Sequence, residues 1–176
     1  VEERVQSVER FWSARVLDPE SNVMFGEGGA GTFSDGKLTS RSKDPRGQRV
    51  LELLAENGAP GEIVYLAKPH IGTDRLRAVV SNLRRRIEQL GGEVWFSARL
   101  SGVRCDAGRI AEIAVTRPDG EVRVPTAALV LATGLGARDT CRMLHRAGVA
   151  MQPKAFAVGC RIEHPQSLID HAQFGD

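Results

Sequence analysis

The most unusual feature of the sequence is a loop rich in glycine, GEGGAGTFSDG, between Gly26 and Gly36. Glycine lets backbone N–H groups approach a ligand without a Cβ in between, so such loops are typical of phosphate and nucleotide sites. The spacing also satisfies the dinucleotide fingerprint G-x-G-x-x-G, but a true fingerprint opens an apolar helix, and the polar stretch 33–40 shows no helical period. Three interpretations remain: a Rossmann first turn, a loop against another part of a nucleotide or flavin, which we favour, or a purely structural loop.

A second candidate is the corner Thr133-Gly134, which follows the apolar run 127–132. An apolar run without alternation is typical of a strand covered on both faces of a parallel sheet. Ligands of open α/β sheets lie beyond the carboxyl ends of such strands, and a small Thr-Gly corner there leaves room for a cofactor. The alternative is a tight turn from a strand into a helix.

Few titratable residues stand out. His70 and His164 are weak candidates for contact with a substrate or flavin, although a loop histidine is more often a hydrogen-bonded anchor. Asp35 and Lys37 flank the glycine loop, where a salt bridge that fixes the loop is the expected role and contact with phosphate the alternative. No spacing indicates a Ser-His-Asp, Cys-His or paired-carboxylate arrangement.

The composition is that of an ordinary globular protein, with 176 residues, 24 Lys+Arg against 22 Asp+Glu, and 41% apolar residues. The near-neutral charge argues against a dedicated nucleic-acid binder, and we expect the run Arg84–Arg86 to be a solvated helix face. The apolar run 127–132 is far too short to span a membrane. We therefore expect no nucleic-acid partner and no membrane partner.

The three cysteines are odd in number, widely spaced and without a CxxC pair. This pattern predicts free thiols rather than a disulfide framework or a zinc site, and no other metal site is expected. A reducing cytoplasm is the corresponding location.

The elements that must position these residues follow from periodicity. Apolar residues at helical spacing predict helices over 1–13, 46–57, 74–90 and 137–147, and the third should be capped by Thr73 and closed by Gly91. Alternation and turn residues predict a β-meander over 93–125, whose first strand contains 94–96. Residues 63–66 and 127–132 are expected as two further strands.

The order of a helix, a meander and then a strand ending in Ala-Thr-Gly resembles the glutathione-reductase-type FAD superfamily. More narrowly, four motifs resemble a bacterial family of largely uncharacterised FAD-dependent dehydrogenases. These motifs are FGEGGAGTFSDGKL at 25–38, KPHIGTD at 68–74, ARDT at 137–140 and RIEHPQ at 161–166.

The resemblance implies an α/β fold: a partial FAD/NAD(P)-binding, Rossmann-like domain over 1–150 that lacks its first βαβ unit, with a substrate or cap domain starting at 151–176. The fingerprint helix and acidic ribose ligand of that family would lie before Val1, so we interpret the chain as an excerpt of a longer protein. One departure is Leu135-Gly136, where the family pattern suggests His-Ser.

The resemblance also implies which residues lie near FAD. The main chain of Leu100 would meet the adenine, and the remaining residues would approach the flavin, the pyrophosphate or the cofactor's edge. These are Gly28, Gly29, Gly31, Thr32, Ser34, Thr133 and Gly134.

The implied function is hydride transfer between an unidentified small-molecule substrate and FAD in the longer protein. The alternatives are an FAD-dependent RNA-modifying enzyme and a non-catalytic nucleotide-binding module. We expect the isolated chain to be inactive and to hold FAD poorly or not at all. An uncovered strand 127–132 would also favour a homodimer.

Overall fold

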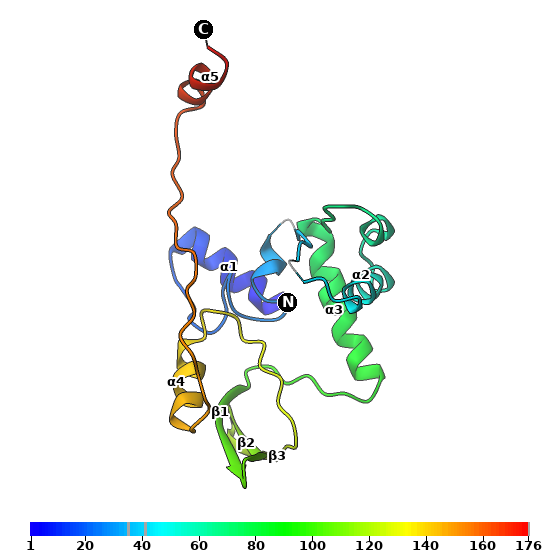
Figure 1. Ribbon diagram of the computed structural model, residues 1–176, viewed down its shortest axis with the longest axis vertical. Helices are drawn as coiled ribbons and strands as arrows, with labels where there is room; N and C mark the ends of the chain where they lie inside the picture. The colour runs from blue at the N-terminus through cyan, green and yellow to red at the C-terminus, as the bar shows by residue number, and fades with distance from the viewer. Residues whose placement is uncertain (35, 41, 176) are drawn as a thin grey trace.

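The computed structural model describes residues 1–34, 36–40 and 42–175 and is a mixed α and β structure (Figure 1). Short 3-10 helices are labelled η. The elements are α1 (Glu2–Ala14), η1 (Ala30–Phe33), α2 (Arg46–Glu56), η2 (Gly61–Val64), α3 (Thr73–Gln89), β1 (Arg99–Asp106), β2 (Arg109–Arg117), β3 (Gly120–Pro125), α4 (Arg138–Arg146) and α5 (Gln166–Phe174).

The predicted meander is confirmed over 99–125 as an antiparallel sheet in the order β1-β2-β3. Its first turn consists of Ala107 and Gly108, both with positive φ (48° and 76°), between the paired residues Asp106 and Arg109. Two positive φ values at the centre of a two-residue loop match the right-handed twist of the strands. The first hairpin therefore turns where the sequence indicated a turn.

Three predicted strands are wrong. Residues 63–66 overlap the 3-10 helix η2, and 94–96 and 127–132 lie outside any strand. The side chain of Val130 is 90% exposed instead of buried. A parallel strand covered on both faces needs neighbours on either side, and the sheet of the described residues contains only the three antiparallel strands of the meander. The partial Rossmann-like domain therefore stays a prediction.

All four predicted helices are present, within one or two residues of their expected ends. In α3, Gly91 (φ 85°) closes the helix as expected. Its N–H donates to Glu88 O (3.0 Å), and Gly92 N–H donates to Ile87 O (2.9 Å), which is a Schellman motif. Thr73 is not the cap: it is the first helical residue, and its Oγ1 donates instead to Ser34 O (2.9 Å).

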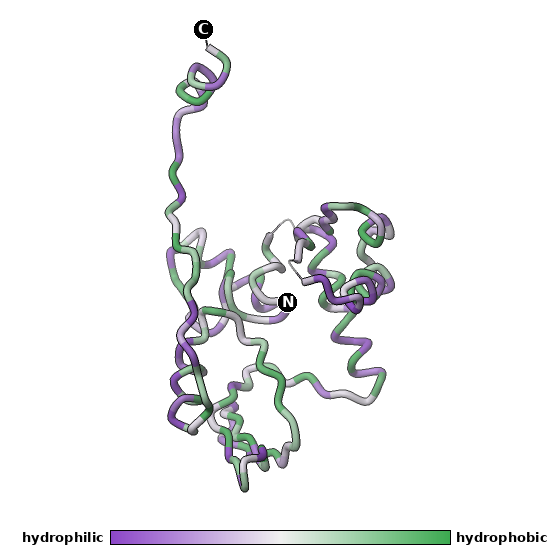
Figure 2. The backbone as a smooth tube through the Cα atoms, in the orientation of Figure 1, coloured by the Kyte–Doolittle hydropathy of each residue, from purple (hydrophilic) through white to green (hydrophobic). Residues whose placement is uncertain are grey.

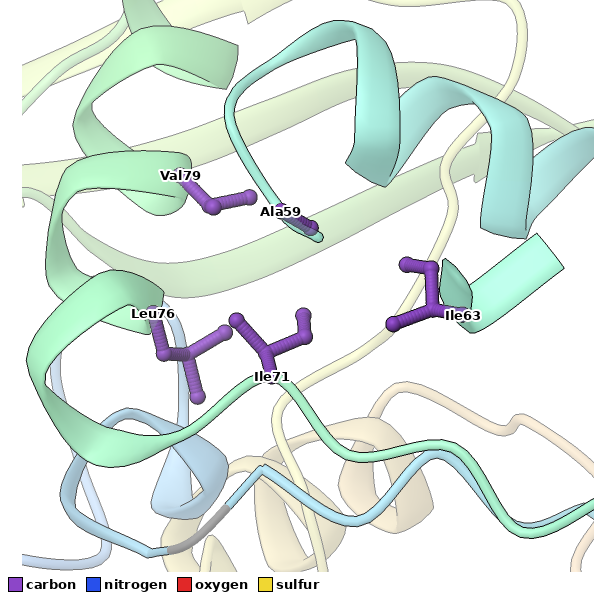
Figure 3. Packing of buried hydrophobic residues seen from close by; sticks show 5 residues of the cluster. All are labelled: Ala59, Ile63, Ile71, Leu76 and Val79. Atoms are coloured by element: carbon purple, nitrogen blue, oxygen red, sulfur yellow. The ribbon is translucent and has the colours of Figure 1, made fainter. Parts of the chain in front are cut away.

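The helices α2, η2 and α3 form what we call the helical half. Its core lies between α3 and the chain from Ala59 to Ile71 (Figure 3). Ile63 and Val79 are fully buried there, with Ile71 and Leu76 nearly so. Leu54 of α2 and Leu83 of α3 pack against this cluster and are partly buried. The apolar faces of α2 and α3 thus meet around η2, beside the glycine loop.

The rest of the chain leaves much apolar surface exposed. Residues 149–165 run as an extended arm to α5, away from the other elements, and Figure 2 shows hydrophobic residues along it. The total accessible surface is 13808 Å², whereas a compact monomer of this mass has about 8,400 Å². The described elements therefore bury less surface than a self-contained domain of this size.

We expect Ile63→Ala to destabilise the helical half by about 2–5 kcal/mol, because it leaves a cavity in a fully buried site. Leu90→Ala is the control, since that side chain is 77% exposed. Urea unfolding followed by helical circular dichroism measures both. Equal effects of the two substitutions would show that this cluster is not the core.

Candidate functional site

The glycine loop is folded around the guanidinium of Arg4, which projects from the buried face of α1 and is 3% exposed. Its Nε donates to Asn22 O (2.8 Å), Nη2 to Val23 O (2.9 Å) and Nη1 to Glu27 O (2.7 Å). A planar guanidinium carries its donors in a fixed fork, so it can satisfy three carbonyls that point at it from different sides. Burial lowers the pKa of Arg4, but a guanidinium does not lose its proton in proteins, so the group remains charged at neutral pH.

Side chains inside the loop complete this arrangement. Asn22 Oδ1 accepts from the N–H groups of Met24 (2.9 Å) and Phe25 (3.2 Å), which forms a tight turn before the glycines. The hydroxyl of fully buried Thr32 donates to Glu27 O (3.2 Å), the same oxygen that accepts from Arg4. The carbonyl of Glu27 is therefore the point where the entry and exit of the loop are joined.

Phe33 anchors the far end of the loop. The guanidinium of Arg4 lies 4.9 Å from its ring centroid, and that of Arg77 from α3 lies 5.0 Å from the same centroid. Both distances are within the range of a cation–π interaction. Phe33 thus connects α1 and α3 through the loop.

Four of the five glycines in the loop fall into two groups. A Cβ on Gly26 would lie 2.5 Å from Arg4 Cδ, and one on Gly28 would lie 2.1 Å from Thr32 Oγ1, so internal packing requires both glycines. A Cβ on Gly29 or Gly31 would meet nothing within 4 Å. The loop therefore uses its first two glycines to close on itself and leaves the later two open to approach from outside.

Three amide groups of the loop lack a partner among the described residues. Gly28, Ala30 and Gly31 are exposed, and their N–H groups donate to no acceptor among the described residues. Backbone N–H groups of a turn that have no internal acceptor are available to an anion, although the amide of Gly29, between the first two, donates within the loop to Gly26 O (2.9 Å). By contrast, the Ser34 hydroxyl is used within the loop, since it donates to Gly31 O (2.8 Å) and accepts from Gly36 N–H (3.2 Å).

Arg84 of α3 links the loop to the segment before β1. Its Nε lies 2.9 Å from Glu27 Oε1 as an ion pair, without the alignment of a hydrogen bond, and its guanidinium lies 5.3 Å from the Phe96 ring centroid. The side chain of Glu27 is 12% exposed, so this pair is shielded from solvent more than a surface salt bridge. Arg84 is therefore no free member of a solvated basic run.

The structure brings His70 to the glycine loop. Lys37 and His70 form an isolated antiparallel bridge, with Leu38 N–H donating to Pro69 O (2.9 Å) and Ile71 N–H to Gly36 O (3.2 Å). His70 is exposed at this junction. Asp35, the other residue expected to flank the loop, lies outside the described residues.

The Thr133-Gly134 corner lies near the entry of the loop. Two residues on, a Cβ at Gly136 would be 2.8 Å from Phe25 Cζ and 3.2 Å from Met24 Cε. Glycine at this position therefore allows the segment to pass directly against the residues that precede Gly26. Thr133 and Gly134 themselves are exposed.

The other two predicted site residues lie elsewhere. Leu100 is part of β1 and pairs with Val115 of β2. His164 is on the exposed C-terminal arm, which no other element covers in the described part of the chain. The structure thus groups His70 and the corner with the loop, and does not bring His164 to it.

A cleft of about 830 Å³ lies beside the loop. Its walls come from the start of α1, the turn before the glycines, the aromatic segment before β1 and the end of β2. Representative residues are Arg4, Gly26, Glu27, Trp95, Phe96 and Arg99. The volume is within the range of small-molecule and cofactor sites, and the cleft runs from the glycine loop to the residue preceding Leu100.

Sequence reasoning missed Arg4 and Arg84. The signal for Arg4 was available, because it falls on the stripe that contains Val1, Val5 and Val8, where a charge is unexpected. A charged residue on an apolar helical face needs a local set of acceptors. Arg84 gave no such signal, since it belongs to a run of three arginines.

In the described part of the chain, no helix is long and apolar enough to cross a membrane, and no group of three or more His, Cys, Asp or Glu residues could hold a metal. The three cysteines are free and exposed.

Comparison with known proteins identifies a relative that aligns with the whole chain. Over all 176 residues, the chain is 50% identical to an uncharacterized protein of Clostridium beijerinckii (strain ATCC 51743 / NCIMB 8052). The chain spans 32% of the length of that relative. No family model matches the chain.

We expect Gly28→Val to destabilise the loop strongly, because it forces a branched side chain against Thr32 and Val80 at a φ of 83°. Gly31→Val should leave thermal stability within about 0.5 kcal/mol, since its Cβ enters open space. Thermal unfolding of the two variants measures the difference. Equal melting temperatures would contradict the division of the glycines into two groups.

Proposed function

We propose that the chain is part of an FAD-dependent oxidoreductase and that its glycine loop holds the anionic part of the cofactor. The observation that carries the proposal is the set of amides at Gly28, Ala30 and Gly31 that have no acceptor in the described part of the chain, beside Gly29 and Gly31, whose outer side is open. A pyrophosphate needs N–H donors and a close backbone approach, and this loop offers both. The motif resemblance to FAD-dependent dehydrogenases supports the same assignment.

The electrostatics of the loop suit an anion. The guanidinium groups of Arg4 and Arg77 both lie close to the ring of Phe33. The hydrogen bonds of Arg4 go to neutral carbonyls rather than to a carboxylate. Among the described residues, Arg4 therefore has no carboxylate ion-pair partner of its own. A positive charge in the same loop as free N–H groups favours phosphate over a neutral ligand.

The side chains of Thr32 and Ser34 would maintain the loop, because both are engaged inside it, while the main chain of Gly29 and Gly31 would contact the cofactor. Thr133 and Gly134 would border the same site, because Gly136, two residues beyond the corner, lies against Phe25. The cleft toward β1 would take the adenine end, where the main chain near Leu100 is within reach. When bound, FAD supplies hydride transfer, and the protein contributes position and electrostatic environment.

His70 is the candidate of choice for contact with a substrate, because the bridge to Lys37 places it at the exit of the loop. His164 would reach the site only if the C-terminal arm folds back in the longer protein. A small-molecule substrate and a cytoplasmic location belong to this proposal, as does a homodimer of the isolated chain through its exposed apolar segment 127–132.

The first alternative is an FAD-dependent enzyme that modifies RNA. This alternative would need the run Arg84–Arg86 as a basic surface for RNA. Two of these arginines have partners within the protein: Arg84 pairs with Glu27, and Arg85 donates to Asn82 Oδ1 (3.0 Å). Filter binding with tRNA at two salt concentrations distinguishes the two, since phosphate contacts impose a steep salt dependence. The second alternative, a non-catalytic nucleotide-binding module, would hold FAD that does not bleach with any reductant.

The longer protein that contains this segment should purify yellow, with non-covalent FAD released on denaturation. The isolated 176-residue chain should bind FAD weakly or not at all, because it leaves an unusually large surface uncovered. Visible absorption and fluorescence titration measure both. A longer protein that stays colourless after FAD is added would contradict the proposed function.

Gly31→Val in the longer protein should raise the FAD dissociation constant at least tenfold without lowering the melting temperature, because the new side chain occupies the open side of the loop. Gly47→Val is the matched control, since a Cβ there also meets nothing within 4 Å and the residue lies in α2, outside the loop. Normal FAD affinity of the Gly31 variant would show that the loop is not the cofactor site.

A further inference from the structure

We propose that Arg4 is the positioning residue of the glycine loop: its three carbonyl contacts turn the amide of Gly28 outward and so build the anion cradle. This inference rests on the proposed function for the identity of the ligand. It concerns a residue of α1 that lies 22 positions before the first loop glycine and, in this arrangement, contacts no cofactor.

The geometry of one peptide unit carries the argument. In a trans peptide the C=O of one residue and the N–H of the next point in opposite directions. Because Glu27 C=O is held on Arg4 Nη1 at 2.7 Å, the N–H of Gly28 must point away from the guanidinium. Gly28 is exposed, and its N–H has no acceptor in the described part of the chain. Arg4 thus sets the direction of the first cradle donor directly.

The other two bonds prevent the unit from rotating. Arg4 also holds the carbonyls of Asn22 and Val23, at the entry of the loop, so the entry and the turn at Glu27 are tied to one rigid group. Gly26 permits this closure, because any Cβ there would collide with Arg4 Cδ at 2.5 Å. The position of Arg4 therefore depends on glycine at residue 26, and the shape of the loop depends on Arg4.

Lysine cannot take this role. It keeps the positive charge, but its ammonium is a compact group on a flexible stem and has no planar fork to reach three separated carbonyls at once. Arg4→Lys consequently separates position from charge. Arg10 provides the matched control, because it lies on the same helix with a half-exposed side chain whose partner, Asp18, is 3.9 Å away.

The experiment uses the longer protein and compares the wild type with Arg4→Lys and Arg10→Lys. We expect Arg4→Lys to speed exchange of the hydrogen-bonded amides in 22–33, such as those of Asn22, Gly29 and Thr32, at least tenfold while exchange in α3 stays unchanged. The FAD dissociation constant should rise at least tenfold. Arg10→Lys should change neither quantity.

A second variant separates positioning from general stability. Arg4→Ala should lose FAD affinity, and ethylguanidinium should restore it, whereas ethylammonium at the same concentration should not. A residue that only stabilises the fold would give no such selectivity. If Arg4→Ala does not fold, the exchange and affinity data for Arg4→Lys decide the question.

The outcomes separate the two proposals. If the wild type binds no FAD, the proposed function fails, and faster exchange confined to 22–33 in Arg4→Lys still supports the positioning role. If the wild type binds FAD and Arg4→Lys binds it equally well, Arg4 does not position the cradle. Unchanged exchange in 22–33 would overturn the inference in either case.

Discussion

The bond between Arg4 and the carbonyl of Glu27 connects most of the features described above. It brings α1 to the glycine loop, fixes the peptide that precedes Gly28, and shares its acceptor with the buried hydroxyl of Thr32. A charged group in a buried position is costly unless its donors are satisfied, and here three carbonyls satisfy them. The same bonds that offset the burial of the charge therefore shape the loop.

A second feature of the structure is its large solvent-exposed surface, much of it apolar. The described chain exposes far more area than a compact protein of its mass, and the apolar run 127–132 has no neighbouring strand. The relative from Clostridium beijerinckii is about three times as long as the matched segment. Additional chain or a partner that covers 127–132 would allow this run to become a strand, and the Thr133-Gly134 corner would then follow its carboxyl end.

The predictions from sequence succeeded where local chemistry decides the structure. The four helices followed from the spacing of their apolar residues, and Gly91 closed α3 because only the left-handed conformation completes the Schellman bonds. The turn at Ala107 and Gly108 likewise fixed the first hairpin. The predictions of strands at 94–96 and 127–132 were wrong because a strand needs a neighbouring strand to pair with, and the periodicity of a segment does not show whether such a neighbour exists. The prediction that Thr73 caps α3 was wrong because its hydroxyl donates to a distant acceptor, Ser34 O. For the site, the sequence indicated the loop and the corner, but not the arginine on which the loop is built.

The central claim is that the outward amides of the glycine loop bind the anionic part of FAD. Residue-resolved amide exchange of the longer protein, with and without FAD, tests it most directly. The account predicts that bound FAD slows exchange at Gly28, Ala30 and Gly31 at least tenfold, while the amides of α2 keep their rates. Unchanged exchange at these three residues in a protein saturated with FAD would contradict it.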